Sequence, residues 1–239
     1  CPQCRSPKIR YAGVGTEKIE SLAGAVFKPA RIARMDSDTM RGADDYEAVL
    51  ERFRRGELDI LIGTQMIAKG LHFPNVTLVG IVNADLGLSM PDFRAPERTF
   101  QLITQVAGRA GRGDIRGEVI IQTHNPENET IQYAAQQDFD GFSKFDLEFR
   151  QLLAYPPYTH LIIVHFRGED ESMVVEFANG FTAELQRYGH EGIRFAGPSP
   201  APIERIKGKF RYMLVIRGSR LKLLRQALRV LALHRQPPK

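Results

Sequence analysis

The sequence lacks the two motifs with which a nucleoside triphosphatase usually holds its phosphates and magnesium. No Gly-x-x-x-x-Gly-Lys-Ser/Thr loop and no DEAH-like acidic box occurs in its 239 residues. An ATP-driven motor needs a phosphate loop with a lysine and an acidic residue that binds Mg²⁺. We therefore expect this chain alone to have no ATPase activity.

Long hydrophobic runs are also absent. No apolar run approaches the ~20 residues of a membrane-spanning helix, and no signal peptide is recognisable. The hydrophobic content of 43% and charged content of 26% predict an ordinary soluble globular protein. A chain of this length forms one large domain or two of ordinary size. Because the first residue is Cys and not Met, we expect a fragment of a longer chain.

Cysteine is scarce, and both cysteines, Cys1 and Cys4, lie at the start of the chain. Two cysteines with two residues between them form half of a tetrahedral zinc site. The spacing is right, but two further ligands are missing. A redox pair is the weaker alternative, since no thioredoxin-like unit surrounds the cysteines.

Positive charge is concentrated near the C-terminal end. The net charge is +5, yet residues 203–239 hold eleven Lys and Arg against one acidic residue, Glu204, so the rest of the chain is acidic. Aromatic residues are interleaved with these charges. A local basic region of this kind indicates contact with nucleic acid, and a merely solvated basic tail is the alternative.

Short apolar segments alternate with helical patterns through the first part of the chain. This alternation is typical of a parallel sheet covered by helices on both faces. Functional loops in such sheets gather at the carboxyl ends of the strands, here residues 13–17, 36–39, 64–72 and 84–92. Strands are predicted at 8–13, 32–35, 60–63, 76–83 and 118–123, and helices at 16–27, 44–55, 129–137 and 139–153.

Several side chains in these elements have predicted structural roles. Thr16 is able to cap the first helix. Asp85 and Asp92 resemble a catalytic carboxylate pair, but the Gly, Ser and Pro residues between them favour a structural role. Two helix faces are predicted to join a core: Tyr46, Val49, Leu50 and Phe53 in one helix, and Phe142, Phe145, Phe149 and Leu152 in another.

The segment around Gln105 predicts a helix with two different faces. Gln105, Arg109 and Arg112 stand at i, i+4 and i+7 and share one side, which suits binding of phosphate charge. A solvated surface helix is the competing interpretation. It does not explain Gly108 and Gly111, which each cost about 1 kcal/mol in a helix. The opposite side would pack against a core and holds Phe100, Ile103, Ala107 and Ala110.

Two motifs resemble the last two helicase motifs of superfamily 2 ATPases. The last is Gln105-x-x-Gly108-Arg109-x-x-Arg112, and the preceding one runs from Gly63-Thr64-Gln65 through Lys69-Gly70-Leu-His72 to Val76. The particular residues of both motifs are similar to those of the PriA family of primosomal replication-restart DNA helicases. The resemblance covers nearly the whole chain and includes Asn83-Ala-Asp85, Pro91-Asp92-Phe93-Arg94 and Glu97-Arg98-Thr99.

The resemblance implies that this chain supplies the second lobe of an ATP-dependent helicase. The phosphate loop would lie on a first lobe upstream of Cys1, which would hold most of the ATP and its Mg²⁺. Arg109 and Arg112 would reach the γ-phosphate as arginine fingers, with Gln105 beside them. Further nucleotide contacts are implied for Gly70, His72 and Gly108. His72 stands where many relatives have an acidic residue, which argues against a sugar-hydroxyl contact from this side chain.

Contacts with DNA are expected from the loops of this lobe. Thr64 and Gln65 directly follow a buried strand, where a hydroxyl and backbone N–H groups can bind the phosphate of a single strand. A turn-forming Thr is the alternative. The resemblance adds Gly15, Thr16 and Lys69.

A boundary follows at Pro156 and Pro157, because two prolines cannot continue a helix. Beyond it the pattern predicts a small α+β domain, similar to the domains that close PriA chains. Its elements are strands at 160–167, 193–197 and 210–217 and helices at 171–188 and 219–233. We therefore divide the chain into a remnant of a zinc-binding segment (1–7), a RecA-like helicase C-terminal lobe (8–153) and a C-terminal α+β domain that binds DNA or proteins (154–239).

The basic strand of this last domain is a second predicted DNA contact. Lys207, Lys209 and Arg211 can meet phosphates. Strand alternation places Phe210 and Tyr212 together on the other face, where they either stack on bases or belong to the core. A stiff proline segment, residues 197–202, leads into this strand.

The resemblance also implies partners and a metal. They are branched or single-stranded DNA, single-stranded DNA-binding protein, other primosome proteins and zinc held by paired Cys-x-x-Cys knuckles, of which Cys1 and Cys4 would be the last. The implied place is the bacterial cytoplasm at the nucleoid, without a membrane. Two alternatives stay open: a DNA- and protein-binding module without catalysis, and a related repair or branch-migration translocase.

Overall fold

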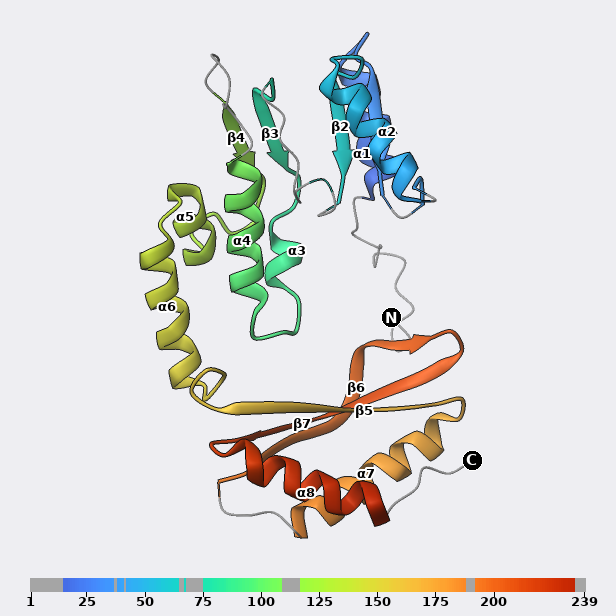
Figure 1. Cartoon of the computed structure of the whole chain (residues 1–239), viewed down its shortest axis with the longest axis vertical. Helices are drawn as coiled ribbons and strands as arrows, with labels where there is room; N and C mark the ends of the chain where they lie inside the picture. Colours follow the sequence, from blue (N-terminus) through green and yellow to red (C-terminus); the bar gives the residue numbers. More distant parts are fainter. Residues whose placement is uncertain are drawn as a thin grey trace, which may run out of the picture. The chain divides into compact units, whose positions relative to one another are not determined.

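The computed structural model describes residues 15–36, 38–40, 42–64, 67, 75–108, 117–187 and 192–234 (Figure 1). These residues fall into two compact units. The first unit holds the described residues up to 85 together with 99–127, and the second holds 86–98 and the described residues from 128 onward. The strand predicted at residues 8–13 lies outside the described residues.

The first unit contains two pairs of parallel strands. β1 (Ile32–Met35) pairs with β2 (Ile60–Gly63), and β3 (Leu78–Ile81) pairs with β4 (Glu118–Ile121). The predicted parallel pairing is confirmed. The described strands form two separate pairs, however, where the sequence pattern predicted one sheet.

Two helices of this unit, α2 and α4, turn the side chains that their periodicity predicts toward a core. α1 (Thr16–Val26) precedes β1, and α2 (Ala43–Arg54) connects β1 to β2. Met35 and Leu50 form a small core, and the predicted face of α2 packs against it through Tyr46, Val49 and Phe53. α4 (Ala95–Ala107) buries Phe100 and Ile103, which are 3% and 1% exposed, as predicted.

Gly63 marks a close approach of β2 to β1. A Cβ on this residue would lie 2.5 Å from the carbonyl oxygen of Met35 and 2.9 Å from Cγ2 of Ile67. Separations under 3 Å force the neighbouring atoms to move, and one of these atoms is backbone. Only glycine fits at the end of β2.

Two helices of the second unit have side-chain caps. The Asn128 side chain accepts a hydrogen bond from the N–H of Thr130 and caps α5 (Glu129–Gln136). Asp138 caps α6 (Phe139–Leu152) by accepting from the N–H of Gly141. α3 (Asp85–Leu88) is a single turn that precedes α4.

The predicted aromatic core face of α6 is only partly right. Phe142 is buried, but Phe149 is 50% exposed and Leu152 is 81% exposed. The buried side of α6 consists instead of Phe142, Asp146 and Arg150. Asp146 and Arg150 neutralise each other at 2.8 Å, which allows charged side chains to occupy a buried face.

A series of contacts between aromatic rings and guanidinium groups connects the parts of the second unit. Phe93 stacks on Tyr155 with a centroid separation of 5.3 Å. The Arg150 guanidinium lies 5.1 Å from the Phe93 ring, and that of Arg217 lies 5.3 Å from the Tyr155 ring. Such cation–π contacts fix the segment before α4 and the end of α6 against the sheet that follows.

That sheet is antiparallel, with the strand order β5-β7-β6. Its strands are β5 (His160–Gly168), β6 (Arg194–Ile206) and β7 (Lys209–Gly218). α7 (Glu171–Arg187) and α8 (Leu221–His234) both cover the same face (Figure 1). The predicted order of strands and helices is confirmed.

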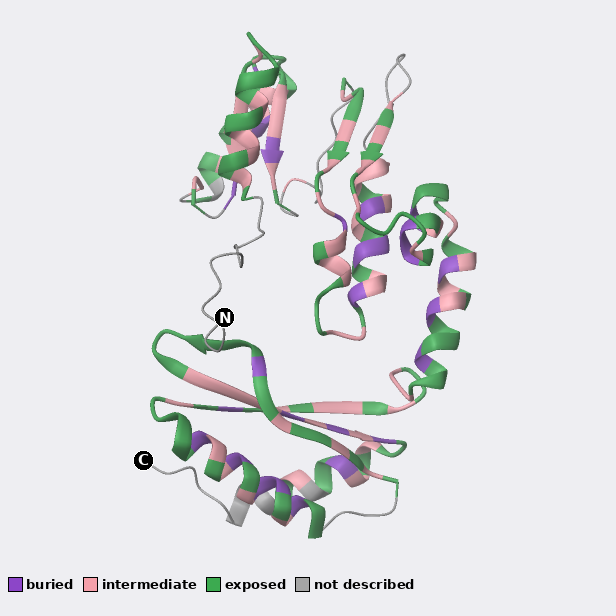
Figure 2. Ribbon diagram, turned by 180° about the vertical axis from the view of Figure 1, so that it is seen from behind, coloured by how far each residue is buried: buried purple, intermediate pink, exposed green. Residues whose placement is uncertain are grey.

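The core of this α+β part lies between the sheet and the two helices, where Figure 2 shows the buried residues. β7 contributes Leu214 and Ile216, and Leu224 is the buried leucine of the predicted α8 stripe. Phe166, Phe177 and Phe181 form a cluster with centroid separations of 5.5 to 6.4 Å.

β6 is longer than predicted, because it continues through the proline segment. Its pairing with β7 is interrupted between Ala196 and Ser199 and again between Pro200 and Arg205. β6 pairs only with β7, so it is an edge strand, where prolines are tolerated. Lys207 and Gly208 then form a two-residue turn with φ of 49° and 80°, as hairpin turns with two positive φ angles require.

Candidate nucleic-acid and nucleotide site

The predicted site residues fall into two groups in the structure. Gly15, Thr16, Thr64, Gln105, Gly108, Lys207, Lys209 and Arg211 are described. The other eight lie outside the described residues, so their roles stay predictions: Cys1, Cys4, Gln65, Lys69, Gly70, His72, Arg109 and Arg112.

Asp36 is the centre of a polar cluster at the carboxyl end of β1. The residue is 5% exposed. Its Oδ1 accepts hydrogen bonds from the backbone N–H groups of Asp38 and Thr39, each at 3.0 Å, and from the Thr39 hydroxyl at 3.1 Å. Its Oδ2 accepts from the Thr16 hydroxyl.

These donors keep Asp36 ionised. The Thr16 hydrogen bond, joined by those from Thr39 and Asp38, lowers the pKa of Asp36 to about 2 against the opposing effect of burial. Arg34 adds a nearby positive charge, with its Nε 3.5 Å from Asp36 Oδ2 and 3.4 Å from Glu20. A fixed carboxylate therefore holds two predicted loops together.

Thr16 does not cap α1, so that prediction was wrong. The N-cap is Gly15, which has no side chain, and Thr16 is the first helical residue. Its hydroxyl is used for Asp36. The start of α1 is thus fixed from the side, while its first turn has no side-chain cap. A helix start of this kind favours an anion such as a phosphate.

Thr64 lies next to this cluster. Gly63 is opposite Met35 in the parallel register, so Thr64 and Asp36 follow neighbouring strands at the same end. Thr64 is exposed, and its carbonyl accepts from the N–H of Ile67 at 3.2 Å. The structure therefore brings Gly15, Thr16 and Thr64 together around Asp36. The sequence analysis selected the loop 36–39 but did not single out Asp36. The signal that could have found Asp36 is a carboxylate directly after a predicted strand.

A second polar cluster joins the carboxyl ends of β3 and β4. Asp85 accepts hydrogen bonds from the Thr123 hydroxyl at 2.8 Å and from the N–H of His124 at 2.9 Å. Donation by His124 and Thr123 lowers the pKa of Asp85. Asp92 instead lies 3.2 Å from Arg94 and 3.0 Å from Arg98. Each carboxylate has its own partners, which supports structural roles for both.

The helix that carries Gln105 has the predicted exposed face within its described length. Gln105 is exposed on α4, opposite the buried Phe100 and Ile103. α4 ends at Ala107, and Gly108 lies in a turn with its N–H donating to the Thr104 carbonyl at 3.0 Å. Gly108 is the last described residue before the two predicted arginine fingers.

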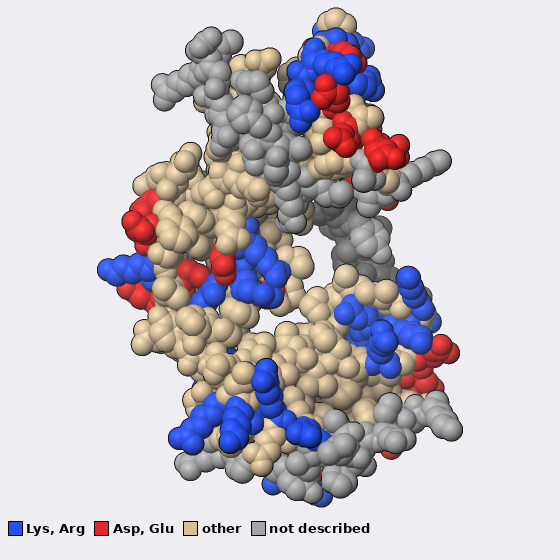
Figure 3. Space-filling model, viewed as in Figure 1, with Lys and Arg blue, Asp and Glu red and all other residues tan. Residues whose placement is uncertain are grey.

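The β6–β7 hairpin presents the second set of predicted DNA contacts. Lys207 is exposed at the turn, and Lys209 is exposed with its Nζ 3.9 Å from Glu169. Arg211 is half-buried and donates to the Ile203 carbonyl at 3.2 Å. Sequence reasoning missed Arg205, whose guanidinium lies 4.7 Å from the Phe210 ring. Figure 3 shows Lys and Arg gathered over this end of the sheet.

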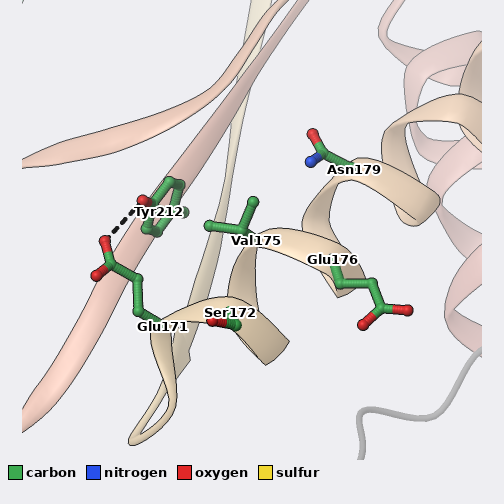
Figure 4. A pocket seen from close by; sticks show the side chains of 6 residues that line it. All are labelled: Glu171, Ser172, Val175, Glu176, Asn179 and Tyr212. Atoms are coloured by element: carbon green, nitrogen blue, oxygen red, sulfur yellow. Dashed lines mark hydrogen bonds between the residues drawn. The ribbon is translucent and has the colours of Figure 1, made fainter.

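The two interpretations of the hairpin aromatics are resolved for Tyr212. This side chain packs against the core, and its hydroxyl donates to Glu171 at 2.9 Å. Glu171 raises the pKa of Tyr212 through this bond. Tyr212 also borders an open hollow of about 570 Å³ on α7 (Figure 4), lined by Glu171, Ser172, Val175, Glu176 and Asn179. Two carboxylates in the lining make the hollow a poor match for DNA.

No metal site is evident in the part of the chain that the structure describes, where no three His, Cys, Asp or Glu side chains gather. Among the same residues, no helix is long and apolar enough to span a membrane.

Comparisons with known proteins agree with this geometry. Residues 14–114 match the helicase conserved C-terminal domain, and residues 151–239 match the primosomal protein N C-terminal domain. The chain is 44% identical over 217 residues to the replication restart protein PriA of Bacillus subtilis, covering 91% of this chain and 27% of that protein.

Other relatives named replication restart protein PriA have similar sequence identity and coverage. The Chlamydia trachomatis protein is 43% identical, covering 91% of this chain and 29% of the relative. The Treponema pallidum protein is 41% identical, covering 96% and 35%. The chain therefore spans about a quarter to a third of the length of these relatives. Both domains are matched in order, and the identity extends along nearly the whole chain. The chain therefore belongs to the PriA family of replication restart proteins and contains a RecA-like helicase lobe followed by the family's C-terminal domain.

Proposed function

We propose that this chain is the C-terminal part of an ATP-dependent DNA helicase that recognises stalled or branched replication forks and restarts replication by primosome assembly. The observation that carries the proposal is the gathering of Thr16, Asp36 and Thr64 at the carboxyl ends of β1 and β2, within the residues that match a helicase domain. Parallel sheets of this kind place their ligand contacts at those ends.

The nucleotide role is assigned to the region after α4. The exposed Gln105 and the turn at Gly108 lead directly to Arg109 and Arg112, which we propose as arginine fingers for the γ-phosphate. Gly70 and His72 are proposed to lie near the same nucleotide. ATP and Mg²⁺ would be held mainly by a first lobe, because this chain has no phosphate loop.

The DNA role is assigned to two places. In the helicase lobe, Gly15, Thr16 and Thr64, with Gln65 and Lys69, are proposed to hold phosphates of a single strand. In the C-terminal domain, Lys207, Lys209 and Arg211 are proposed to hold phosphates of branched DNA. Exposed lysines at the hairpin turn support this assignment.

The remaining assignments concern domains, metal, partners and location. We propose a zinc-binding remnant at 1–7, a helicase lobe at 8–153 and a C-terminal domain at 154–239. Cys1 and Cys4 would supply half of a zinc site. Single-stranded DNA-binding protein and other primosome proteins are proposed partners, in the cytoplasm at the nucleoid.

The test uses the helicase that contains this chain. Changing Arg109→Ala should lower DNA-stimulated ATP turnover by about 10³-fold or more, because an arginine finger stabilises transition-state charge. DNA affinity should stay near that of the wild type. Lys144→Ala, which removes an exposed charge from α6, is the matched control. Normal ATP turnover in Arg109→Ala would refute the nucleotide assignment.

A non-catalytic DNA- and protein-binding module is the second candidate, favoured by the missing phosphate loop. For this chain alone the two proposals agree in expecting no ATP hydrolysis. They differ in the helicase that contains it, where a mere binding module would tolerate Arg109→Ala.

A further inference from the structure

The three-stranded sheet of the C-terminal part has one face without helices. Tyr212 and Leu214 of β7 point to the core beneath α7 and α8, so alternate residues of each strand lie on the opposite face. We call this the open face. Its paired positions are Leu161, Ile163, His165 and Arg167 of β5, Lys209, Arg211, Met213, Val215 and Arg217 of β7, and Arg194, Ala196, Ser199 and Ile206 of β6.

Arginines lie directly opposite arginines on this face. Arg167 is paired across the strands with Arg211, and Arg194 with Arg217. Like charges in such positions destabilise a sheet. No Asp or Glu occupies any paired position of the open face.

The hydrogen bonds of these arginines do not neutralise them. Arg211 donates to the carbonyl of Ile203, and Arg217 donates to the carbonyl of Leu153. Arg167 and Arg194 have no ion pair with an acidic residue in the described part of the chain. A guanidinium carries five N–H donors, so each arginine retains capacity for a phosphate.

The two arginine pairs stand at opposite ends of an apolar centre. Arg211 and Arg217 stand six positions apart on β7, which corresponds to about 20 Å. Between them lie Ile163, which is 45% exposed, and the half-buried Met213 and Val215. Figure 3 shows Lys and Arg over both ends of this sheet, with uncharged residues between them.

We propose that the open face binds single-stranded DNA across the strands. The arginine pairs hold phosphates at the two ends, and the apolar centre with His165 contacts the bases. A duplex would present phosphates and leave the apolar centre unused, whereas an unpaired strand turns its base faces outward. The proposal rests on the proposed function and deepens it. The DNA contacts of this domain were assigned so far to the hairpin, and the proposal adds the open face as a binding surface and single-stranded DNA as its ligand.

The test measures binding of this chain to a labelled thymidine oligonucleotide of about twelve nucleotides, by fluorescence anisotropy over a range of salt. The double variant Arg167→Gln/Arg194→Gln should bind about tenfold more weakly. The slope of log affinity against log salt should become shallower by about 1.4, the value for two lost phosphate contacts on a single strand. Its melting temperature should not fall, since the change removes like-charge repulsion.

The matched control is Lys222→Gln/Arg229→Gln, which removes two exposed charges from α8 on the other side of the sheet. It should keep the affinity and the slope. Ile163→Ala should weaken binding without changing the slope, because it removes an apolar contact and no charge.

Three outcomes would overturn the proposal: an unchanged salt slope in Arg167→Gln/Arg194→Gln, equal affinity for a duplex of the same length, or equally good competition by polyglutamate. If Lys207→Gln/Lys209→Gln weakens binding while Arg167→Gln/Arg194→Gln does not, the hairpin contact of the proposed function stands and the open face fails. If the unmodified chain binds no DNA, the DNA contacts of the proposed function fail.

Discussion

The Thr16 hydroxyl donates a hydrogen bond to the carboxylate of Asp36 and so joins the start of α1 to the loop after β1. The two residues are twenty positions apart in the chain. Arg34 adds a second connection, since its Nε lies 3.4 Å from Glu20 of α1 and 3.5 Å from Asp36. Both residues of the hydrogen bond lie in loops predicted to be functional, and the loop that contains Thr16 was predicted to contact DNA. Their relative position therefore depends in part on one neutral donor and one ionised acceptor.

Thr16→Val tests this contact. Valine keeps the branched shape but has no hydroxyl, so the pKa of Asp36 should rise toward its ordinary value and the melting temperature should fall by several degrees. Single-stranded DNA affinity should fall as well, because the start of α1 loses its lateral support.

Thr16→Ser is the companion variant. It keeps the hydroxyl and should retain both properties. Equal melting temperatures for Thr16→Val and the unmodified chain, measured by circular dichroism, would show that the hydrogen bond is not needed to hold the loops.

High salt should change the pKa of Asp59 more than that of Asp36, although the pKa of each is lowered to about 2. Asp36 is held mainly by neutral donors, led by Thr16. Asp59 is held by Arg31, whose Nη2 lies 2.7 Å away on an exposed surface. At ~1 M salt the screening length is about 3 Å. The pKa of Asp59 should then move back toward its ordinary value, while that of Asp36 stays low.

The contribution of Asp36 to the stability of the folded state should decrease as the pH falls. A carboxylate with a lowered pKa stabilises the folded state fully above the unfolded pKa of about 4. That contribution is lost as the pH falls toward 2. Carboxyl titrations by NMR at two salt concentrations measure both groups. A parallel shift of the two residues would contradict the distinction between neutral and charged donors.

Gly63→Ala should destabilise the first unit. The added Cβ would meet the Met35 carbonyl at 2.5 Å, so β1 and β2 must separate. Overpacking of this kind costs about 1–3 kcal/mol. Gly80→Ala in β3 is the control, because nothing lies within 4 Å of its added Cβ. Urea denaturation should show a lower midpoint for the first variant only, and similar midpoints would contradict the close approach.

Arg150→Met should cost about 3–5 kcal/mol, since it leaves Asp146 buried without its partner. Burial already raises the pKa of Asp146, an effect that Arg150 partly offsets. The double variant Arg150→Met/Asp146→Leu should recover most of this loss, because an apolar pair of similar size needs no neutralisation. A double variant as unstable as the single one in urea would show that the contact of Arg150 with Glu97, at 2.7 Å, dominates.

The order and type of the described elements could be predicted from short patterns. β1 and β2 have the predicted bounds, because each is a short, mainly apolar segment that is followed by a polar residue, Asp36 or Thr64. The face of α2 follows from the spacing of Tyr46 and Phe53. In these elements local pattern and packing agree.

The errors have physical causes that lie beyond local pattern. The α6 face was assigned from its phenylalanines, but Asp146 and Arg150 are four residues apart and neutralise each other, which turns the buried side toward them. β6 was ended at residue 197 because prolines interrupt most strands, and its place at the sheet edge depends on the tertiary fold.

The candidate site was predictable as a set of loops and less so as a set of residues. Parallel strands made it possible to group the loops that contain Thr16 and Thr64. The role of Asp36 depends on a hydroxyl twenty residues away, which no local spacing indicates. The cross-strand arginine pairs likewise depend on register, because Arg167 and Arg211 are far apart in the sequence.

The prolines of β6 also affect how this protein behaves at high concentration. A sheet with a free edge recruits strands from other molecules, which is a common route to aggregation. Pro198, Pro200 and Pro202 lack the amide hydrogens that such recruitment needs, and the interruptions beside them distort the edge further. Self-association by strand addition is therefore blocked on the β6 side, and any intermolecular growth of this sheet would have to begin along β5.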